Sequence, residues 1–222
     1  MRSFQAITKG RSRLALVGVA VAFGALVFGV VPAMAGLTVK RFAFSARNQN
    51  GTPDVQAGSH PYALTSTLVL NEPGPTNGDV KDVTVELPPG LVGNPNATPK
   101  CNYQELVKEE ENNQRLCSNE AVVGIATSYL RTVGNEGVGP VSDPVYNLAP
   151  PAGVPAEFGF VAAGTTPVLL EASVRTGSDY GITESVPDVN QAVLVGASKV
   201  TIWGVPASPV HNLIRGDRKS VV

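Results

Sequence analysis

Two cysteines, Cys101 and Cys117, are the residues of this sequence best suited to chemistry. A thiol can form a disulfide, bind a metal ion or act as a nucleophile. A metal site needs further ligands, but the two histidines, His60 and His211, are far from both cysteines in the sequence. A cysteine nucleophile needs a base, and no motif supplies one. Because the two cysteines of an exported chain usually pair, we expect a disulfide that closes a loop of about 15 residues.

Motifs for catalysis or cofactor binding are missing from the rest of the sequence. There is no His-Glu-x-x-His, no Gly-x-Ser-x-Gly, no phosphate-binding loop and no dinucleotide-binding glycine pattern. We interpret His60, which precedes Pro61 at the start of an expected strand, as a turn residue rather than a catalytic base. The role of His211 stays open. The sequence therefore predicts no enzyme activity, no cofactor and no metal.

Three further sets of side chains could bind a ligand, and each also has a structural interpretation. Glu109–Glu111 are adjacent, so on a helix they point in different directions and cannot converge on one ion. Asp79 and Asp82 flank a turn and could bind calcium, but no coordinating loop pattern accompanies them. We interpret Trp203, in the segment TIWGVP, as part of the sheet core rather than as a sugar-binding platform.

The elements that would position these residues are β-strands, because apolar and polar residues alternate along most of the chain. In Val80–Leu87, for example, Val83 and Val85 share one face and Thr84 and Glu86 share the other. Gly, Pro and Asn separate such segments, which is typical of a sandwich of short antiparallel strands. We expect strands at Leu37–Ser45, Tyr62–Leu70, Val80–Leu87, Val122–Leu130, Val145–Leu148, Glu157–Ala162, Val168–Arg175, Tyr180–Val186 and Val193–Val205.

One segment between the cysteines has a different pattern. Asn102–Leu116 is polar and contains neither Gly nor Pro, which predicts a short surface helix of two or more turns. A bridge between Cys101 and Cys117 would staple this helix to the edge of the sheet. The predicted fold class is therefore all-β, an antiparallel β-sandwich with one short surface helix.

The first 35 residues have the pattern of an export signal. A basic segment is followed by the apolar run Leu14–Val31 and by Ala33-Met34-Ala35, which predicts cleavage between Ala35 and Gly36. The apolar run has 18 residues, so an uncleaved membrane anchor remains an alternative. In both cases the rest of the chain is secreted or held at the cell surface, and it meets the membrane only through this segment.

The last six residues, Asp217–Val222, read DRKSVV. This hexapeptide matches the translation of a common sequencing adapter that is followed by a stop codon. We therefore expect residues 217–222 to be foreign and the natural protein to continue past Gly216. The expected domain spans residues 36–216, with a possible subdivision near residue 150.

The charge of the mature segment argues against nucleic acid as a partner. The chain has 17 basic and 18 acidic residues, and four of the basic ones lie in residues 1–35. Residues 36–222 therefore carry 13 basic and 18 acidic residues, a net charge of −5. A nucleic-acid-binding surface would need a basic stripe, which this composition does not favour.

Five segments carry a resemblance to known proteins: AGSHPY (57–62), VELPPGLVGNPNATPKC (85–101), PVYNLAPPAGVPAEFGF (144–160), EASVRTGSDYGIT (171–183) and VTIWGVPASPVHNLIRG (200–216). Together they resemble large, uncharacterised secreted β-rich proteins of high-GC bacteria. The resemblance implies export, a wall- or matrix-associated role, and an N-terminal module of a longer protein. It supplies no catalytic residues.

The leading functional hypothesis is a non-catalytic extracellular structural or adhesive module with cell-wall or matrix components as partners. One alternative is a β-sandwich that binds carbohydrate or another ligand through exposed Tyr, Trp and Asp side chains. Another is an accessory domain of a secreted hydrolase. The oligomeric state stays open at this stage.

Overall fold

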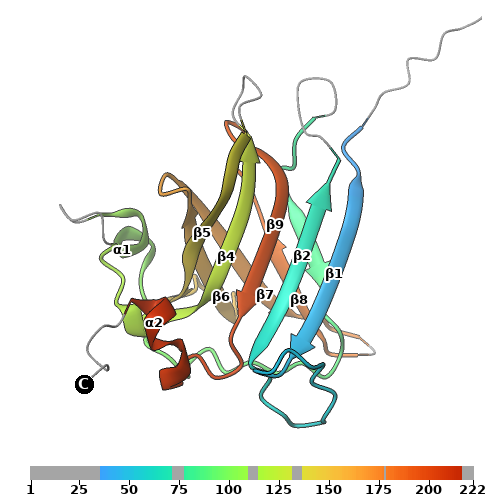
Figure 1. Cartoon of the computed structure of the whole chain (residues 1–222), viewed down its shortest axis with the longest axis vertical. Coiled ribbons are helices and arrows are strands. Elements are labelled where there is room, and N and C mark those ends of the chain that lie inside the picture. Colours follow the sequence, from blue (N-terminus) through green and yellow to red (C-terminus); the bar gives the residue numbers. More distant parts are fainter. Residues whose placement is uncertain (1–35, 72–77, 110–114, 132–136, 178, 217–222) are drawn as a thin grey trace, which may run out of the picture. The chain divides into compact units, whose positions relative to one another are not determined.

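The computed structural model describes residues 36–71, 78–109, 115–131, 137–177 and 179–216 (Figure 1). These residues all belong to one compact unit within residues 34–222. The expected export signal (1–35), Glu110 and Glu111, and the expected foreign tail (217–222) lie outside the described residues.

Nine β-strands in the described residues confirm the all-β, antiparallel fold that the sequence predicts. Each expected strand overlaps one observed strand, because alternation of apolar and polar residues marks a strand with one buried face. The strands are β1 (Val39–Arg47), β2 (Ala63–Leu70), β3 (Val83–Glu86), β4 (Val122–Arg131), β5 (Gly137–Leu148), β6 (Ala156–Ala162), β7 (Thr166–Val174), β8 (Ile182–Val186) and β9 (Leu194–Ile202). The short helices are α1 (Tyr103–Val107), η1 (Asn119–Ala121), η2 (Pro209–His211) and α2 (Asn212–Arg215).

The strands form one curled sheet in the order β1-β2-β9-β4-β5-β6-β7-β8-β3, and every neighbouring pair is antiparallel. In Figure 1, β1, β2, β9, β4 and β5 lie in front of β6, β7 and β8, so two halves of the sheet face each other as the layers of a sandwich do. Strand directions alternate along this order, so the edge strands β1 and β3 run in the same direction. Within the described residues β1 and β3 do not pair, and the curled sheet stays open between them.

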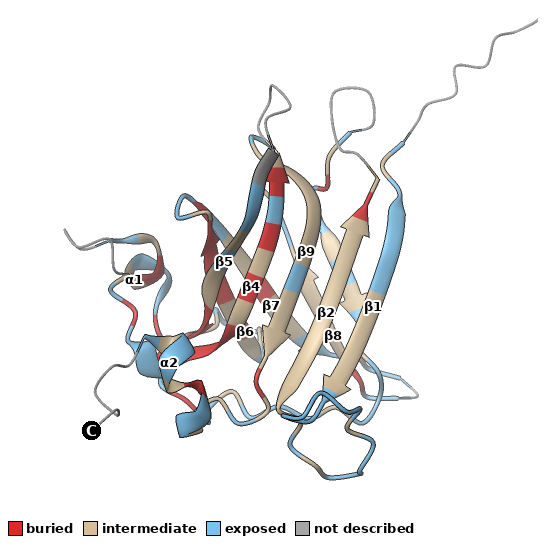
Figure 2. Ribbon diagram, viewed as in Figure 1, coloured by how far each residue is buried: buried red, intermediate tan, exposed pale blue. Residues whose placement is uncertain are grey.

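The core consists of two clusters on opposite faces of the sheet. The inner cluster lies between the two halves and includes Val123, Leu130, Val145, Phe160 and Leu170. The other cluster surrounds the disulfide at one end of β4 and β5. Figure 2 shows many buried residues on β4, whereas β1 is exposed over much of its length. The most tightly packed part of the sheet is therefore its middle, and β1 is a weakly covered edge.

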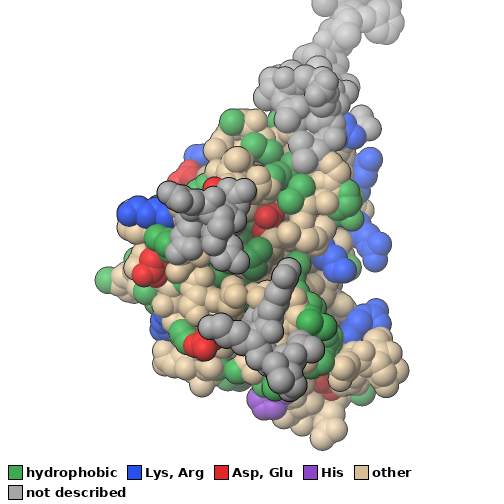
Figure 3. Space-filling model, turned by 60° about the vertical axis from the view of Figure 1, so that its left-hand side comes forward, with side chains coloured by type: hydrophobic (Ala, Val, Ile, Leu, Met, Phe, Trp, Pro, Cys, Tyr) green, Lys and Arg blue, Asp and Glu red, His purple; other side chains and the backbone are tan. Residues whose placement is uncertain are grey.

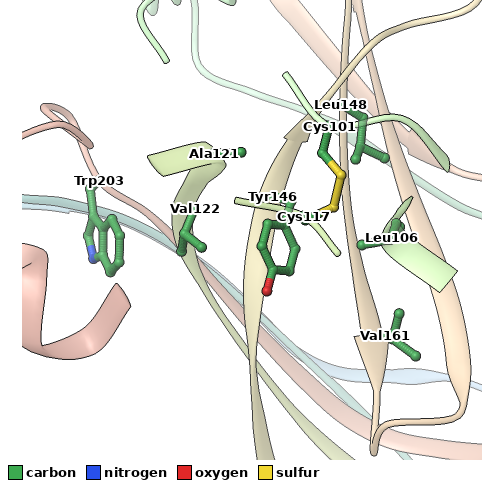
Figure 4. Packing of buried hydrophobic residues seen from close by; sticks show 9 residues of the cluster. All are labelled: Cys101, Leu106, Cys117, Ala121, Val122, Tyr146, Leu148, Val161 and Trp203. Carbon is green, nitrogen blue, oxygen red and sulfur yellow. A yellow bond between two sulfur atoms is a disulfide. The ribbon is translucent and has the colours of Figure 1, made fainter. Parts of the chain in front are cut away.

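The predicted disulfide between Cys101 and Cys117 is confirmed, with Cα atoms 5.4 Å apart. Its position differs from the prediction, because Cys101 pairs with Leu148 at the end of β5, in the middle of the strand order and not at an edge. Both cysteines are buried against Leu106 and Tyr146 (Figure 4). The bridge thus closes part of the hydrophobic core.

The predicted helix over residues 102–116 is too long, since α1 spans only Tyr103–Val107. The Asn102 side chain accepts a hydrogen bond from the Glu105 amide, and the Glu105 carboxylate accepts one from the Asn102 amide. This capping box fixes where the helix begins. Beyond the end of α1, Glu109 and Arg115 form an isolated antiparallel bridge, and the Arg115 guanidinium donates to the Val107 carbonyl and pairs with Glu109 at 2.7 Å. The polar composition of residues 102–116 does not reveal that Glu109 and Arg115 pair in antiparallel orientation.

The prediction of a surface helix also missed one buried contact. Leu106 of α1 is fully buried and packs over Gly159 of β6. A Cβ atom at Gly159 would lie 2.9 Å from Leu106 Cδ2 and 2.7 Å from Leu148 Cδ1, closer than normal contact allows. Glycine at this position therefore lets α1 dock on the sheet.

Candidate functional site

The two aspartates considered for calcium binding hold backbone amides instead. The Asp79 carboxylate accepts hydrogen bonds from the amides of Val80 (2.8 Å) and Val195 (3.2 Å). The Asp82 carboxylate accepts one from the Asp188 amide (3.0 Å). These contacts attach the segment before β3 to the start of β9 and to the segment after β8, which gives both aspartates a structural role.

Trp203 lies in the core, as the sequence predicts, and is only 4% exposed. Its ring stacks on His211, with centroids 4.2 Å apart and an interplanar angle of 8°. Burial and the nearby Arg215 guanidinium lower the pKa of His211. A buried stack of this kind offers no platform for a sugar ring, so the carbohydrate hypothesis loses its principal residue. His60, in contrast, is exposed.

The described residues contain neither a cluster of metal ligands nor a membrane-spanning helix. No group of three or more His, Cys, Asp or Glu side chains there is arranged to hold a metal ion. None of the helices in that part of the chain is long and apolar enough to cross a bilayer. On the face shown in Figure 3, hydrophobic side chains lie in small groups separated by polar atoms.

The curled sheet encloses an apolar cavity of about 110 Å³ between its two halves. Strands from both halves line it with Val, Leu and Phe side chains, among them Leu68 on β2, Phe160 on β6 and Val200 on β9. Three serines, Ser66, Ser128 and Ser198, add hydroxyl groups to the lining. An apolar cavity of this kind stays dry or takes up apolar molecules.

Glu184 on β8 is the one ionisable residue among those that line the cavity. It lies opposite Val85 of β3 and Ala172 of β7, and it shares the inner face with Val186. In the described part of the chain its carboxyl has no hydrogen bond and no ion pair. Burial raises the pKa of Glu184, because few polar groups replace the lost water. Among the described residues that line the cavity, the half-buried Glu184 therefore supplies the one carboxyl.

A groove of about 490 Å³ runs between the edge strands β1 and β3 and opens the molecule at this side. The groove and the inner cavity share apolar lining residues on both edges, including Phe42 of β1 and Val83 and Val85 of β3. Phe42 is 46% exposed although it points inward, because no strand covers it. The shared residues make the groove the entrance to the cavity.

The rims of the groove carry free strand edges. The consecutive residues Asp82–Glu86 all line the groove, although their side chains alternate between the two faces of the sheet. The free edge of β3 therefore runs along the groove. The Leu87 amide donates to the Ile182 carbonyl, so alternate β3 residues bond to β8 and the amides of Thr84 and Glu86 point away from it. Both rims therefore combine backbone groups with apolar side chains.

Reasoning from the sequence did not single out Glu184, although a signal was present. In the expected strand Tyr180–Val186, Glu184 and Val186 occupy the same face by the two-residue period. A charged residue on the apolar face of a strand is unusual and marks a position to examine. Which face pointed inward depended on the pairing with β3, which the sequence does not give.

Comparisons of this chain with protein-family models, with curated proteins and with solved structures found no match.

Proposed function

We propose that this chain is a non-catalytic extracellular binding module that holds an apolar ligand in the groove between β1 and β3 and in the cavity behind it. The observation that carries the proposal is an apolar interior that opens to solvent between the edge strands β1 and β3. We call this gap between the two unpaired strands the seam. The disulfide is compatible with an oxidising compartment, and the export signal expected in residues 1–35 supports a place outside the cytoplasm.

The size and lining of the site suit a small hydrophobic ligand. Ligand pockets usually measure about 300–1,000 Å³ and combine apolar walls with few polar groups. The groove, at about 490 Å³, falls in this range. Burial of apolar surface would drive binding, and each buried CH₂ group contributes about 0.8 kcal/mol. An alkyl chain is therefore the simplest ligand that can fill both the groove and the cavity behind it.

Titration of the exported protein with 1-octanol and 1-decanol tests this function. We expect saturable binding with about a fourfold gain in affinity for each added CH₂ group. NMR shift changes should centre on β1, β2 and β3, with little change near Trp203. Calorimetry would supply the affinities.

Two tryptophan variants provide the control. Val83→Trp places a large ring in the groove, whereas Ser173→Trp places the same ring on the exposed outer face of β7, away from the residues that line the groove and the cavity. Binding should be lost in the first variant and kept in the second. Equal binding by both variants, or no binding of either alcohol to the unmodified protein, would refute the proposed site.

The structural or adhesive module remains a second candidate, because β1 and β3 both offer unpaired edges. They run in the same direction, so one added strand can lie antiparallel to both and complete an all-antiparallel barrel. A partner would bind by strand addition, with backbone hydrogen bonds to both rims.

Thr84→Pro tests this second candidate, because it removes an amide that points to the groove and spares the bonds to β8. Self-association or retention on cell-wall material should fall in this variant and persist in Thr84→Val. If neither assay detects any association of the unmodified protein, the adhesive function has no support.

A further inference from the structure

We propose that the site prefers amphiphiles with a cationic head group over neutral or anionic amphiphiles of the same chain length, and that Glu184 makes this selection. The inference rests on the proposed function, because it names the ligand class of the same site. Among the described residues, Glu184 is the one ionisable residue that lines the cavity, and it has no partner. Asp82 and Glu86 line the groove in front of the cavity, but both are exposed, so water screens their charges.

The position of Glu184 places its carboxyl near the entrance. Glu184 pairs with Val85, which belongs to the edge strand β3 and lines both the groove and the cavity. The carboxyl is therefore one strand inward from the opening. A ligand that enters between β1 and β3 passes it, and its chain can continue among Leu68, Phe160 and Leu170.

Electrostatics favours a cation at this point. A carboxylate that loses water without gaining a partner is unfavourable, and a ligand ammonium group would supply both charge and hydrogen-bond donors. A ligand carboxylate would instead face a like charge. The serine hydroxyls of the cavity can bond to head groups of any charge, so they do not set the preference.

The test compares three ligands that differ only in the head group: decylamine, 1-decanol and decanoate. The exported protein is titrated with each at pH 7 and low salt, below the concentration at which the ligand forms micelles. Glu184→Gln removes the charge with little change of shape. Glu171→Gln is the matched control, because Glu171 lies on the neighbouring strand β7, opposite Ser185 on the other face of the sheet.

We expect decylamine to bind the unmodified protein about tenfold or more tightly than 1-decanol, as one charge-assisted hydrogen bond would give. Decanoate should bind more weakly than 1-decanol. In Glu184→Gln the three affinities should converge, and in Glu171→Gln the preference should persist.

The outcomes separate this inference from the proposed function. Equal binding of the three ligands to the unmodified protein, or a preference that survives Glu184→Gln, would overturn the inference and leave the alkyl-binding function intact. Failure of all three ligands to bind would overturn both. The comparison on the unmodified protein does not depend on the folding of any variant.

Discussion

At the scale of single residues, the half-buried carboxyl of Glu184 contrasts with the amide nitrogen of Asn147. The Asn147 side chain, only 2% exposed, donates from Nδ2 to the carbonyls of Pro95 and Thr98 and so attaches the segment before Cys101 to β5. Such a contact compensates for lost water. Glu184 has no comparable partner among the described residues, which suits a binding group better than a structural one.

The raised pKa of Glu184 predicts how stability depends on pH. Because the folded protein holds this proton more tightly than the unfolded chain, its contribution is most favourable below the unfolded pKa, about 4.3, and is lost as pH rises through the folded pKa. We therefore expect Glu184→Gln to be more stable than the unmodified protein at pH 7 and equal to it at about pH 3.5. Urea unfolding at both pH values measures the difference.

A comparison of the two proteins removes the contributions of other carboxyls. Burial also raises the pKa of Asp143 and of Glu157, but both groups are present in both proteins. A stability difference that does not change with pH would show that the carboxyl of Glu184 is well solvated in the folded state. The proposed preference for cationic head groups would then have no electrostatic basis, because it depends on a carboxyl that has lost water.

At the scale of elements, the disulfide and α1 close one end of the sheet. The loop between the cysteines has a sequence separation of 16 residues, and both cysteines lie in the cluster around Leu148. Arg115 also donates to the Gly164 carbonyl in the turn between β6 and β7. The excursion from Cys101 to Cys117 is therefore attached to the sheet at several points.

Replacement of both cysteines by serine should lower stability without abolishing the fold. The bridge restricts the unfolded chain, which is worth about 3 kcal/mol for a loop of this length. The inner core does not depend on it, because its residues lie on the other face of the sheet. Thermal unfolding measures the loss, and far-UV circular dichroism checks the strands. A loss of all strand signal at room temperature would mean that the bridge is required for folding.

Gly159 controls the docking of α1, so Gly159→Ala should destabilise the protein by about 1–3 kcal/mol. The added methyl group would collide with the ends of Leu106 and Leu148. Gly139→Ala on β5 is the control, since a Cβ atom there meets nothing within 4 Å. Chemical denaturation of both variants tests the prediction. Equal stability of the two variants would show that the leucines move aside at no cost.

At the scale of the whole molecule, the sheet is tightly packed in its middle and open at its seam. Buried residues concentrate on β4, β5, β6 and β7, whereas β1 and β3 border the groove. Edge strands with one free side open more easily than central ones. The strands that we expect to open most easily therefore border the proposed entrance.

Hydrogen exchange should reveal this gradient. We expect the amides of β1 and β3 to exchange fastest among the strands and those of β4 and β5 slowest. Saturation with 1-decanol should slow exchange in β1 and β3 more than elsewhere. Mass spectrometry of the exchanged protein measures both effects. Protection of β1 equal to that of β4 would indicate that the seam is closed in solution.

Much of the local structure follows from the sequence, because it depends on near neighbours. Alternation places Val83 and Val85 on one face of β3 and Thr84 and Glu86 on the other, and the observed burial agrees. Residues 137–144 of β5 escaped prediction, since Pro140, Pro144 and the nearby glycines are typical of turns. Only pairing with β4, such as Pro144 with Ile125, makes that segment a strand.

The sequence by itself determined most of the strand positions, the two faces of those strands and the pairing of Cys101 with Cys117. The tertiary structure decided the order of the strands, since contacts such as Leu64 with Ile202 join residues that no local pattern relates. That order leaves β1 and β3 unpaired, opens the groove and turns Glu184 inward. A strand shows its alternation locally, but which face becomes the interior depends on partners far along the chain.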